Sequence, residues 1–382
     1  VMPSYLSGKD YLLLSVGLRA LDHSLKVGNT EFSPVVYSLY GSFRTAIFSA
    51  YKSGYEFGNL AFQMTKKYEI TEFRAVVNFH RFCIINHWRV HLRECIPIGR
   101  QSYADCLDSG NLIWACFNGI RIPAARFVVG DSIKEVVKEA ESFLGFIQLT
   151  RDQNMIDNAR FLYYAYLCLL GSTESATSWN TPEFNETETL QRMLDSDFKS
   201  GVTVFYVYKA QNLYLNEQFE QGLEYINKAL KIIISIPGLP EFAELYFYRG
   251  LLLSALYQDA DINGKLQIRR QLVMVRRKFR KWAKNCPDNH LHKSLVLEAE
   301  SYRIKGKARH AAQLYNEALG VAKSSGYTQN QAIISELAAN FYEDLGIEEV
   351  ARSYFLKARS LYQKWGAGCK VDILSQKYPS YI

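Results

Sequence analysis

The chain has 382 residues, a formal net charge of +7, an aromatic content of 14% and only 9 prolines. This composition excludes a disordered chain, and the charge is too small for a protein that coats nucleic acid. The length exceeds that of an ordinary single domain. A solenoid has no single core, however, so the size limit of a one-core domain does not apply to it.

Residues 1–171 show the apolar periodicity of helices and almost no strand-like alternation. The first helix, Tyr11–Val27, is interpreted either as a capping helix or as the tail of a preceding domain. The other helices are predicted over Val36–Lys52, Tyr55–Tyr68, Thr71–Arg93, Ile96–Leu107, Leu112–Val128, Ser132–Leu149 and Met155–Leu170. Gly54, Gly130 and Gly171 separate helical stretches at multiples of about 40 residues, which is the spacing of helix-pair repeats.

Residues 172–185 are rich in Ser, Thr and Asn and contain Pro182, so they form either a surface loop or a disordered insertion. Helices resume in residues 186–382, beginning with Glu186–Ser200. A pair of longer helices is predicted over Glu241–Tyr257 and Lys265–Lys284, joined by a turn-rich segment.

A register of small and aromatic residues occurs twice near the end of the chain. The copies are Ala299, Tyr302, Gly306, Ala311, Tyr315, Ala318 and, 40 positions later, Ala339, Tyr342, Gly346, Ala351, Phe355, Ala358. A weaker third copy runs from Ala210 to Ala229, with Glu217 in place of the turn glycine. Alanines let two helices approach closely, and glycine permits the tight turn between them. The repeats predict an all-α, right-handed superhelix of stacked antiparallel helix pairs, similar to tetratricopeptide repeats.

The first helix of each pair in such an array faces the concave groove. The residues predicted to line this groove are Gln211, Tyr214, Lys293, Glu300, Arg303, Asn340 and Glu343. Their mixture of charges and amides suits the capture of a peptide or a small ligand. Each of them could also be an ordinary exposed polar side chain.

The helix predicted over Lys265–Lys284 has two contrasting sides. Ile268, Leu272, Val275, Phe279 and Trp282 recur at helical spacing and form one apolar stripe. The basic face opposite contains Arg269, Arg270, Arg276, Arg277, Arg280, Lys281 and Lys284. This face is either a solvated outer surface or a docking site for an acidic protein or peptide. Nucleic acid is not expected as a partner, because no aromatic side chains interleave with the charges.

A second polar cluster, His80, Cys83, His87 and His91, has spacings of three, four and four residues. On one continuous helix these side chains share a face, and histidines at i and i+4 can bind one metal ion. His87 and His91 are therefore candidate metal ligands. The alternative interpretation is that these side chains pack between helices and donate hydrogen bonds to the backbone, and no metal is predicted on balance.

The motifs of common enzymes are missing from the sequence. There is no phosphate-binding loop, dinucleotide-binding glycine motif, nucleophile elbow or kinase catalytic loop. The segment is therefore predicted not to be an enzyme and to need no cofactor. Its seven cysteines form no C-x-x-C pair, and no apolar run is long enough to span a membrane, so a reduced, cytoplasmic location is expected. The chain opens Val1-Met2-Pro3 without a signal sequence, as expected for an internal segment.

Several short motifs resemble one family. They are Gly54-Tyr-Glu-Phe-Gly58, Asn86-His-Trp-Arg-Val-His91, Trp282-Ala-Lys-Asn-Cys-Pro287, Asn289-His-Leu-His-Lys293 and Trp365-Gly-Ala-Gly-Cys-Lys-Val371. Together they resemble the tetratricopeptide-like region of large multidomain sensor kinases of bacteria and some fungi. In that family a kinase-like domain and a STAND-type ATPase precede this region, and a GAF domain and a histidine kinase follow it. The region is also similar to the repeat domain of the maltose-regulon activator of bacteria.

This resemblance implies a regulatory sensor or protein-interaction scaffold within a cytoplasmic signalling protein. Its partners would be ATPase, kinase or GAF domains of the same chain, an acidic protein or peptide, or a small effector, but not a membrane. Two alternatives remain open: a metal-binding or enzymatic segment around His87 and His91, and a helical array that binds nucleic acid.

Overall fold

The protein is an all-α solenoid in a computed structural model that describes residues 10–70 and 73–381. Its helices are α2 (Asp10–Val27), α3 (Ser33–Ala46), α4 (Tyr51–Lys67), α5 (Arg74–His80), η1 (Arg81–Ile85), η2 (Asn86–Trp88), α6 (Leu92–Asp108), α7 (Leu112–Val128), α8 (Ile133–Leu149), α9 (Gln153–Leu170), α10 (Glu186–Asp195), α11 (Lys199–Leu215), α12 (Phe219–Lys231), η3 (Ile233–Ser235), α13 (Pro240–Ala255), α14 (Ile262–Asn285), α15 (Pro287–Ile304), α16 (Ala308–Ser324), α17 (Thr328–Asp344), α18 (Glu348–Trp365), α19 (Gly368–Lys377) and η4 (Pro379–Tyr381). Within these ranges the only strand-like pairing is one isolated bridge between Thr181 and Phe184. The chain start and the predicted helix start at Thr71 lie outside the described residues.

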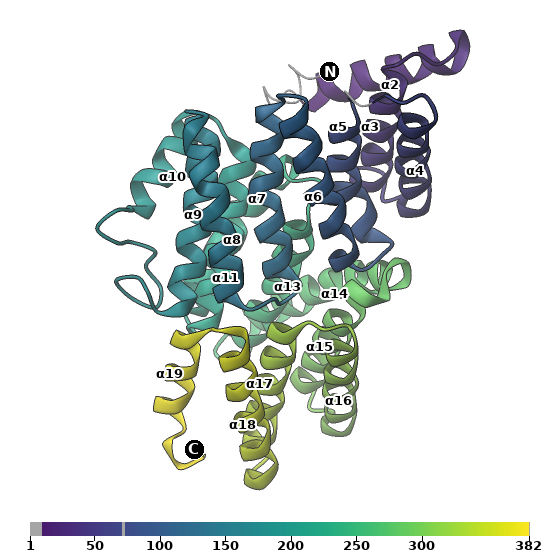
Figure 1. Cartoon of the computed structure of the whole chain (residues 1–382). Helices are drawn as coiled ribbons and strands as arrows, with labels where there is room; N and C mark the ends of the chain where they lie inside the picture. Colours follow the sequence, from purple (N-terminus) through teal and green to yellow (C-terminus); the bar gives the residue numbers. More distant parts are fainter. Residues whose placement is uncertain (1–9, 71–72, 382) are drawn as a thin grey trace.

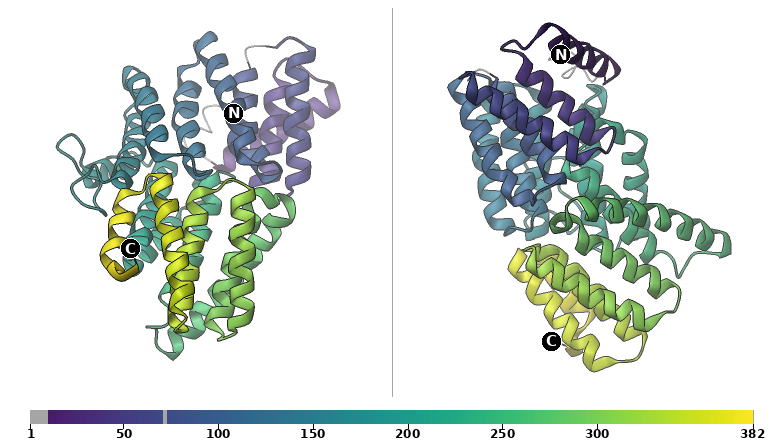
Figure 2. Two further views of the ribbon diagram at one scale, coloured as in Figure 1. Left: turned by 60° about the horizontal axis from the view of Figure 1, so that its bottom comes forward. Right: turned by 90° about the vertical axis from the view of Figure 1, so that its right-hand side faces the viewer.

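Consecutive helices pack against each other, and alternate helices form two layers. Helices α9, α11, α13, α15 and α17 contact one another in order and form an inner layer, while α12, α14, α16 and α18 cover it from outside (Figures 1 and 2). Helix α11 is buried on all sides, since every residue from Gly201 to Leu215 is buried. An outer helix such as α16 buries a single stripe instead. The predicted solenoid of helix pairs is therefore confirmed.

The repeated register has the structural role that its residue types predict. All six alanines of the two clear copies are completely buried, at the contacts between the paired helices. Gly306 and Gly346 end the turns with φ of 66° and 71°, a backbone conformation that favours glycine. Glu217 adopts the same left-handed conformation, with φ of 60°, at the equivalent turn of the third copy.

The solenoid winds so that its C-terminal helix returns to a helix near the middle of the chain. Helices α15 to α19 lie below α2 to α9 in Figure 1, and α19 packs against α9. Cys369 of α19 donates its thiol hydrogen to the carbonyl of Cys168 in α9, at a sulfur–oxygen distance of 3.2 Å. The last α-helix of the array therefore contacts a helix that lies about 200 residues earlier in the chain.

Three predicted boundaries are wrong. Gly54 does not separate helices but lies inside α4, where a Cβ atom would come within 2.0 Å of Thr45 Oγ1 and 2.8 Å of the Gly41 carbonyl oxygen. The turn lies earlier, at Ser49, whose φ is 51°. The predicted helix Glu186–Ser200 is two helices, because α10 ends at Asp195 and α11 begins at Lys199. The third boundary, near His80, is described with the site below.

The segment 172–185 contains no helix and is held by buried contacts. Trp179 is fully buried, and the Lys209 ammonium lies 4.9 Å from its ring centroid. Lys209 also donates to the carbonyl of Thr177 (2.6 Å) and forms an ion pair with Glu186 (2.7 Å). The largest buried cluster includes residues from both sides of this loop, so the helices before and after it share one core.

Candidate functional site: the central pocket

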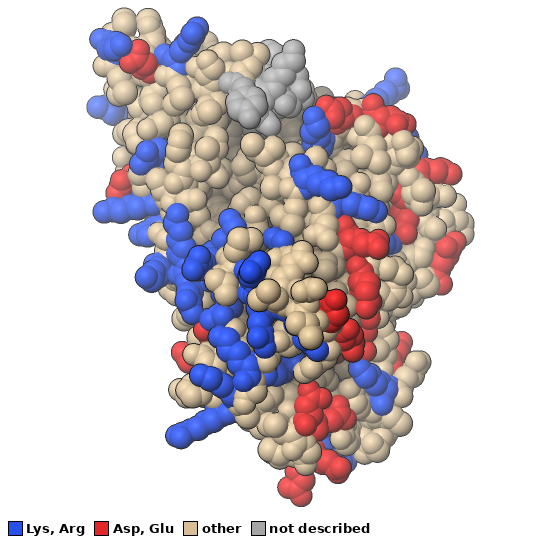
Figure 3. Space-filling view, turned by 180° about the vertical axis from the view of Figure 1, so that it is seen from behind, with Lys and Arg blue, Asp and Glu red and all other residues tan. Residues whose placement is uncertain are grey.

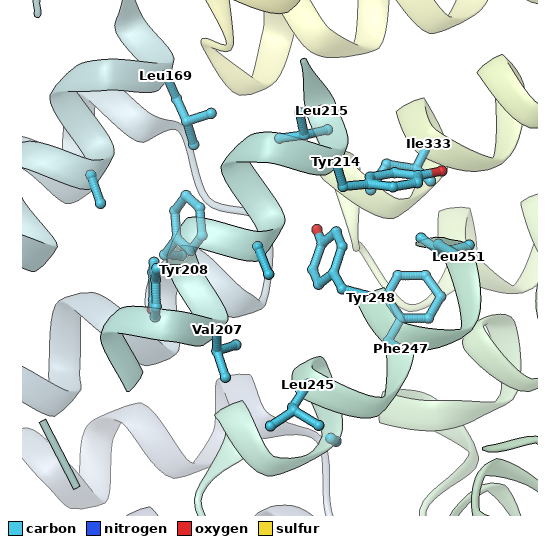
Figure 4. Packing of buried hydrophobic residues seen from close by; sticks show 14 of the residues in the cluster. Leu169, Val207, Tyr208, Tyr214, Leu215, Leu245, Phe247, Tyr248, Leu251 and Ile333 are labelled. Atoms are coloured by element: carbon cyan, nitrogen blue, oxygen red, sulfur yellow. The ribbon is translucent and has the colours of Figure 1, made fainter. Parts of the chain in front are cut away.

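A central pocket of about 190 Å³ lies among the inner helices. Its lining residues come from α11, α12, α13, α15, α17 and α19, with one from the turn after α11: Tyr214, Glu217, Phe219, Leu251, Ala255, Glu300, Arg303, Glu336, Leu337, Asn340, Asp344, Lys370 and Lys377. Figure 4 shows part of the apolar surroundings, with the Tyr214 and Tyr248 side chains next to each other. The Tyr214 and Tyr248 rings meet edge to face, with centroids 5.7 Å apart.

Four of the seven predicted groove residues line this pocket: Tyr214, Glu300, Arg303 and Asn340. Lys293 is instead buried beside the Glu244 carboxylate, with which it forms an ion pair. Gln211 is buried and hydrogen-bonded to the Tyr248 side chain. Glu343 lies at the rim, hydrogen-bonded to Tyr378 and Tyr381.

Two lysines of α19 attach this helix to the pocket wall. Lys370 Nζ lies 2.6 Å from Glu336 Oε1 of α17 and 3.4 Å from Glu217 Oε1, in the turn after α11. Lys377 Nζ lies 2.7 Å from Glu217 Oε2. Burial alone would raise the pKa of Glu217, but the two lysines outweigh it and the pKa is lowered. This side of the pocket is therefore formed by contacts between segments more than 150 residues apart in sequence.

The opposite wall carries a second charged group. Arg303 pairs with Glu300 (2.7 Å) and donates to the carbonyl of Ser254 (3.1 Å), while Tyr315 donates its hydroxyl hydrogen to Glu300. The attraction of Glu300 raises the pKa of Arg303. Asn340 Oδ1 accepts a hydrogen bond from Tyr378 (3.3 Å), and no described residue accepts one from Asn340 Nδ2. Paired charges, an open amide and apolar walls can bind a small polar ligand or one side chain of a peptide.

The basic helix α14 has the predicted buried stripe, since its buried residues are Ile268, Leu272, Val275, Phe279 and Trp282. Its cations differ in their surroundings. Arg276 is largely covered and forms a two-pronged ion pair with Glu298, which Arg280 joins at 3.0 Å. The Arg269 guanidinium lies 5.3 Å from the Tyr257 ring centroid, and Lys281 Nζ lies 5.9 Å from that of Tyr51. Arg277 and Lys284 are exposed to solvent.

The predicted shared face of His80, Cys83, His87 and His91 is wrong, because the helix does not continue. His80 ends α5, and Arg81–Ile85 form a π-helix, in which Asn86 donates its N–H to the carbonyl five residues earlier. The wider turn changes the angular spacing of the side chains. A short 3-10 helix follows, and His91 has an extended ψ of 134° as the N-cap of α6.

His87 and His91 bind backbone carbonyls on distant parts of the chain. His87 Nε2 lies 2.7 Å from the Gly238 oxygen, and burial lowers the pKa of His87 to about 4. His91 Nε2 lies 2.8 Å from the Ser325 oxygen, and its Nδ1 accepts the N–H of Arg93 (3.0 Å). Within residues 10–70 and 73–381, no group of three or more His, Cys, Asp or Glu residues could hold a metal ion.

The interpretation that these histidines pack between helices and bond to the backbone agrees with these contacts, but the sequence did not predict that His87 joins successive turns of the solenoid. We call His87, Trp88, Gly238, Asn289 and His290 the inter-turn seam. Trp88 donates its indole hydrogen to the Gly238 carbonyl (3.0 Å), and its ring stacks on His290 with centroids 5.3 Å apart. Asn289 Nδ2 donates to the carbonyl of His87 (2.6 Å). The seam thus joins the motif Asn86–His91 to the motif Asn289–Lys293, both of which carry the family resemblance. Their shared membership of that resemblance was the one feature of the sequence that could have indicated this contact.

The structure thus defines a helix-pair solenoid with a central pocket. No protein-family model matches the chain. It is 24% identical over 151 residues to hybrid signal transduction histidine kinase G of Dictyostelium discoideum, a match that covers 39% of this chain and 4% of that protein. The chain therefore resembles only a small part of a signalling kinase.

Two solved structures match most of the length of this chain, both with low TM-scores. One is the apo form of the quorum sensor NprR from B. thuringiensis, 12% identical, with a TM-score of 0.46 and coverage of 94% of this chain and 96% of that one. The other is a circular tandem repeat protein, 12% identical, with a TM-score of 0.21 and coverage of 99% and 92%. Scores this low do not establish a shared fold. Among the described helices, none has the length and apolar character needed to cross a bilayer.

Proposed function

We propose that this chain is a regulatory sensor and protein-interaction segment of a cytoplasmic signalling protein. The proposal is supported by the solenoid fold, by the missing catalytic motifs and by the partial similarity to a hybrid histidine kinase. The match spans only 4% of that kinase, so the presence of further domains beside this segment is itself proposed. The resemblance to tetratricopeptide-like sensor regions suggests a STAND-type ATPase, kinase or GAF domain as the neighbour in the same chain.

The observation that carries the proposal is that helices from the middle of the chain and the C-terminal helix α19 build the pocket together. Tyr214 and Glu217 come from α11 and its turn, whereas Lys370 and Lys377 come from α19. A ligand that binds these walls more tightly in one arrangement shifts the population toward that arrangement. Because both lysines of α19 contact the pocket walls, such a shift would move α19 relative to α11 and α17.

The test is to look for a bound ligand and to remove its contacts. Native mass spectrometry of the chain, incubated with an extract of its own cells, should show an added mass in the range of a metabolite or short peptide. Tyr214→Ala with Asn340→Ala should abolish this added mass. The control, Gln313→Ala on the exposed side of α16, should retain it. No added mass, or one that the pocket variant keeps, would contradict the proposal.

We further propose that the isolated segment is not an enzyme. His87 and His91 are hydrogen-bonded to backbone carbonyls, which supports a structural role over a metal-dependent reaction. The 382-residue chain should hydrolyse no ATP above the buffer rate, and elemental analysis should find no stoichiometric zinc. One tightly held zinc ion per chain would instead favour the metal-binding alternative.

A further inference from the structure

The solvent side of α14 is an unusual surface for an outer helix. Its exposed stripe runs Leu266, Arg270, Val273, Met274, Arg277, Lys281 and Lys284, at helical spacing and opposite the buried stripe. We call these residues the outer face of α14. Leu266, Val273 and Met274 are 49%, 40% and 54% exposed. The first half of this face is therefore apolar with one arginine, and the second half is entirely cationic.

The charge on this face has little compensation. Helix α14 contains no acidic residue between Ile262 and Asn285. Glu298 reaches it from α15 but is already paired with Arg276 and Arg280. Among the described residues, Arg270, Arg277 and Lys284 have no hydrogen-bond or ion-pair partner. Figure 3 shows lysine and arginine side chains gathered on one part of the back of the molecule, and aspartate and glutamate on another.

We propose that the outer face of α14 docks an acidic amphipathic helix of a partner protein. The argument is complementarity: Leu266, Val273 and Met274 offer a narrow apolar seam, and the arginines and lysines beside it require acidic residues opposite. Methionine and leucine beside cations adapt well to a docked helix. The proposal rests on the role as an interaction segment, but it does not depend on the central pocket.

Two other classes of partner fit this face less well. A membrane-bound helix inserts a broad apolar side, but the broad apolar side of α14 is buried in the core. A single-stranded nucleic acid needs aromatic platforms, and Phe279 and Trp282 are also buried there. A helix spanning the distance from Leu266 to Lys284 would be about 27 Å long, or roughly five turns.

The experiment measures binding of a designed peptide by fluorescence anisotropy. The probe is an acetylated, amidated peptide of about 18 residues with leucines along one stripe and glutamates beside it. The same residues in scrambled order, which form no stripe, serve as its control. We expect the striped peptide to bind at least tenfold more tightly than the scrambled one. Binding should also weaken steeply as salt is raised.

Two double variants locate the binding site and separate the contribution of its charged residues from that of its apolar residues. Arg270→Glu with Arg277→Glu should weaken binding at least tenfold, and Val273→Ser with Met274→Ser should weaken it about tenfold without changing net charge. Lys357→Glu with Lys364→Glu, on exposed positions of α18, makes the same charge change elsewhere and should have little effect. All these positions are exposed, and unchanged melting temperatures would exclude unfolding.

Several outcomes would overturn the proposal. Equal binding of striped and scrambled peptides, or no effect of the serine variant, would leave only non-specific attraction. A loss caused equally by the α18 variant would place binding elsewhere. Stronger binding to phosphatidylserine-containing vesicles or to single-stranded RNA than to the striped peptide would identify a different partner class. Asn340→Ala should leave peptide binding unchanged, so failure of this test and failure of the pocket test remain distinguishable.

Discussion

Asn289 shows how one side chain can hold two turns of the solenoid together. Its Nδ2 donates to the carbonyls of His87 (2.6 Å) and Val90 (3.0 Å). Its Oδ1 accepts hydrogen bonds from the N–H of Leu92 (3.0 Å) and the hydroxyl of Tyr327 (2.6 Å). The residue is buried, so water cannot replace these partners.

Asn289→Ala should therefore lower the free energy of unfolding by about 3 kcal/mol, because several buried polar groups lose their partner together. Urea denaturation of both proteins measures the difference. Asn285→Ala is the matched control: its half-buried side chain bonds only to the Lys281 carbonyl, so a change within about 0.5 kcal/mol is expected. Equal effects of the two substitutions would show that the seam adds little stability.

His87 should make the stability depend on pH. Burial lowers its pKa from 6.5 to about 4 in the folded protein. Between these values the unfolded chain binds more protons than the folded one, so stability is complete above pH 6.5 and is lost as pH falls toward 4. The loss for one histidine is roughly 3 kcal/mol.

The comparison with His87→Gln isolates this contribution, because glutamine can still donate to the Gly238 carbonyl but does not titrate. From pH 6.5 to 4, the wild-type protein should lose roughly 3 kcal/mol more stability than the variant, measured by urea denaturation at each pH. His80, whose pKa burial also lowers to about 4, provides a second case through His80→Gln. Parallel stability curves for variant and wild type would mean that the imidazole is protonated without penalty in the folded state.

Replacing a helix glycine with alanine can lower or raise stability, depending on which atoms lie beside the glycine. Gly54 of α4 faces Gly41 and Thr45 of α3, and these helices approach too closely for a methyl group. Gly145 of α8 has no atom within 4 Å of the place where a Cβ would lie. Both residues lie in helices, so their intrinsic propensities are the same.

Gly54→Ala should accordingly destabilise the protein by about 1–3 kcal/mol, because α3 and α4 must separate to admit the methyl group. Gly145→Ala should stabilise it by about 0.5–1 kcal/mol, since alanine restricts the unfolded chain more than glycine does. Thermal or urea unfolding of the two variants measures both changes in stability, and the two changes should have opposite signs. A stabilising Gly54→Ala would show that the α3–α4 contact is looser than the structure indicates.

For the whole molecule, a few polar contacts attach the C-terminal helix α19 to helices far from it in sequence. Helix α19 is held by Lys370 and Lys377 on Glu217, by Lys370 on Glu336, and by Cys369 on the Cys168 carbonyl. The Lys377–Glu217 ion pair keeps partial solvent contact and is therefore weak, whereas Lys370 is buried and holds α19 more firmly.

Glu217→Gln should loosen α19 while leaving the rest of the array intact. Hydrogen exchange followed by mass spectrometry should show faster exchange in Gly368–Lys377 and little change in α15 and α16. The expected acceleration is about two- to tenfold, because Lys370 keeps Glu336 and only part of the attachment is lost. Glu224→Gln on an exposed site of α12 should have no effect on α19. Unaltered exchange in α19 would mean that its apolar contacts alone hold it.

The features that could be predicted from the sequence are those set by neighbours along a helix. The buried stripe of α14 follows from the spacing of Ile268, Leu272 and Val275, and the close pairs follow from alanines and a turn glycine that recur after 40 residues. Burial of one helix face requires only the helical period, so the pattern is local. Gly54 was misread because glycine serves a turn and a close helix contact equally well.

The attachment of α19 to the pocket wall, the inter-turn seam and the π-helix depend on the winding of the whole chain. His87 meets Gly238, and Lys370 meets Glu217, across about 150 residues, and no local period relates these positions. The apparent metal face of His87 and His91 disappears because the backbone between them leaves the α-helix to reach carbonyls on another turn. A hydrogen bond or an ion pair requires both partners at a fixed distance, and that distance exists only after the helices have stacked.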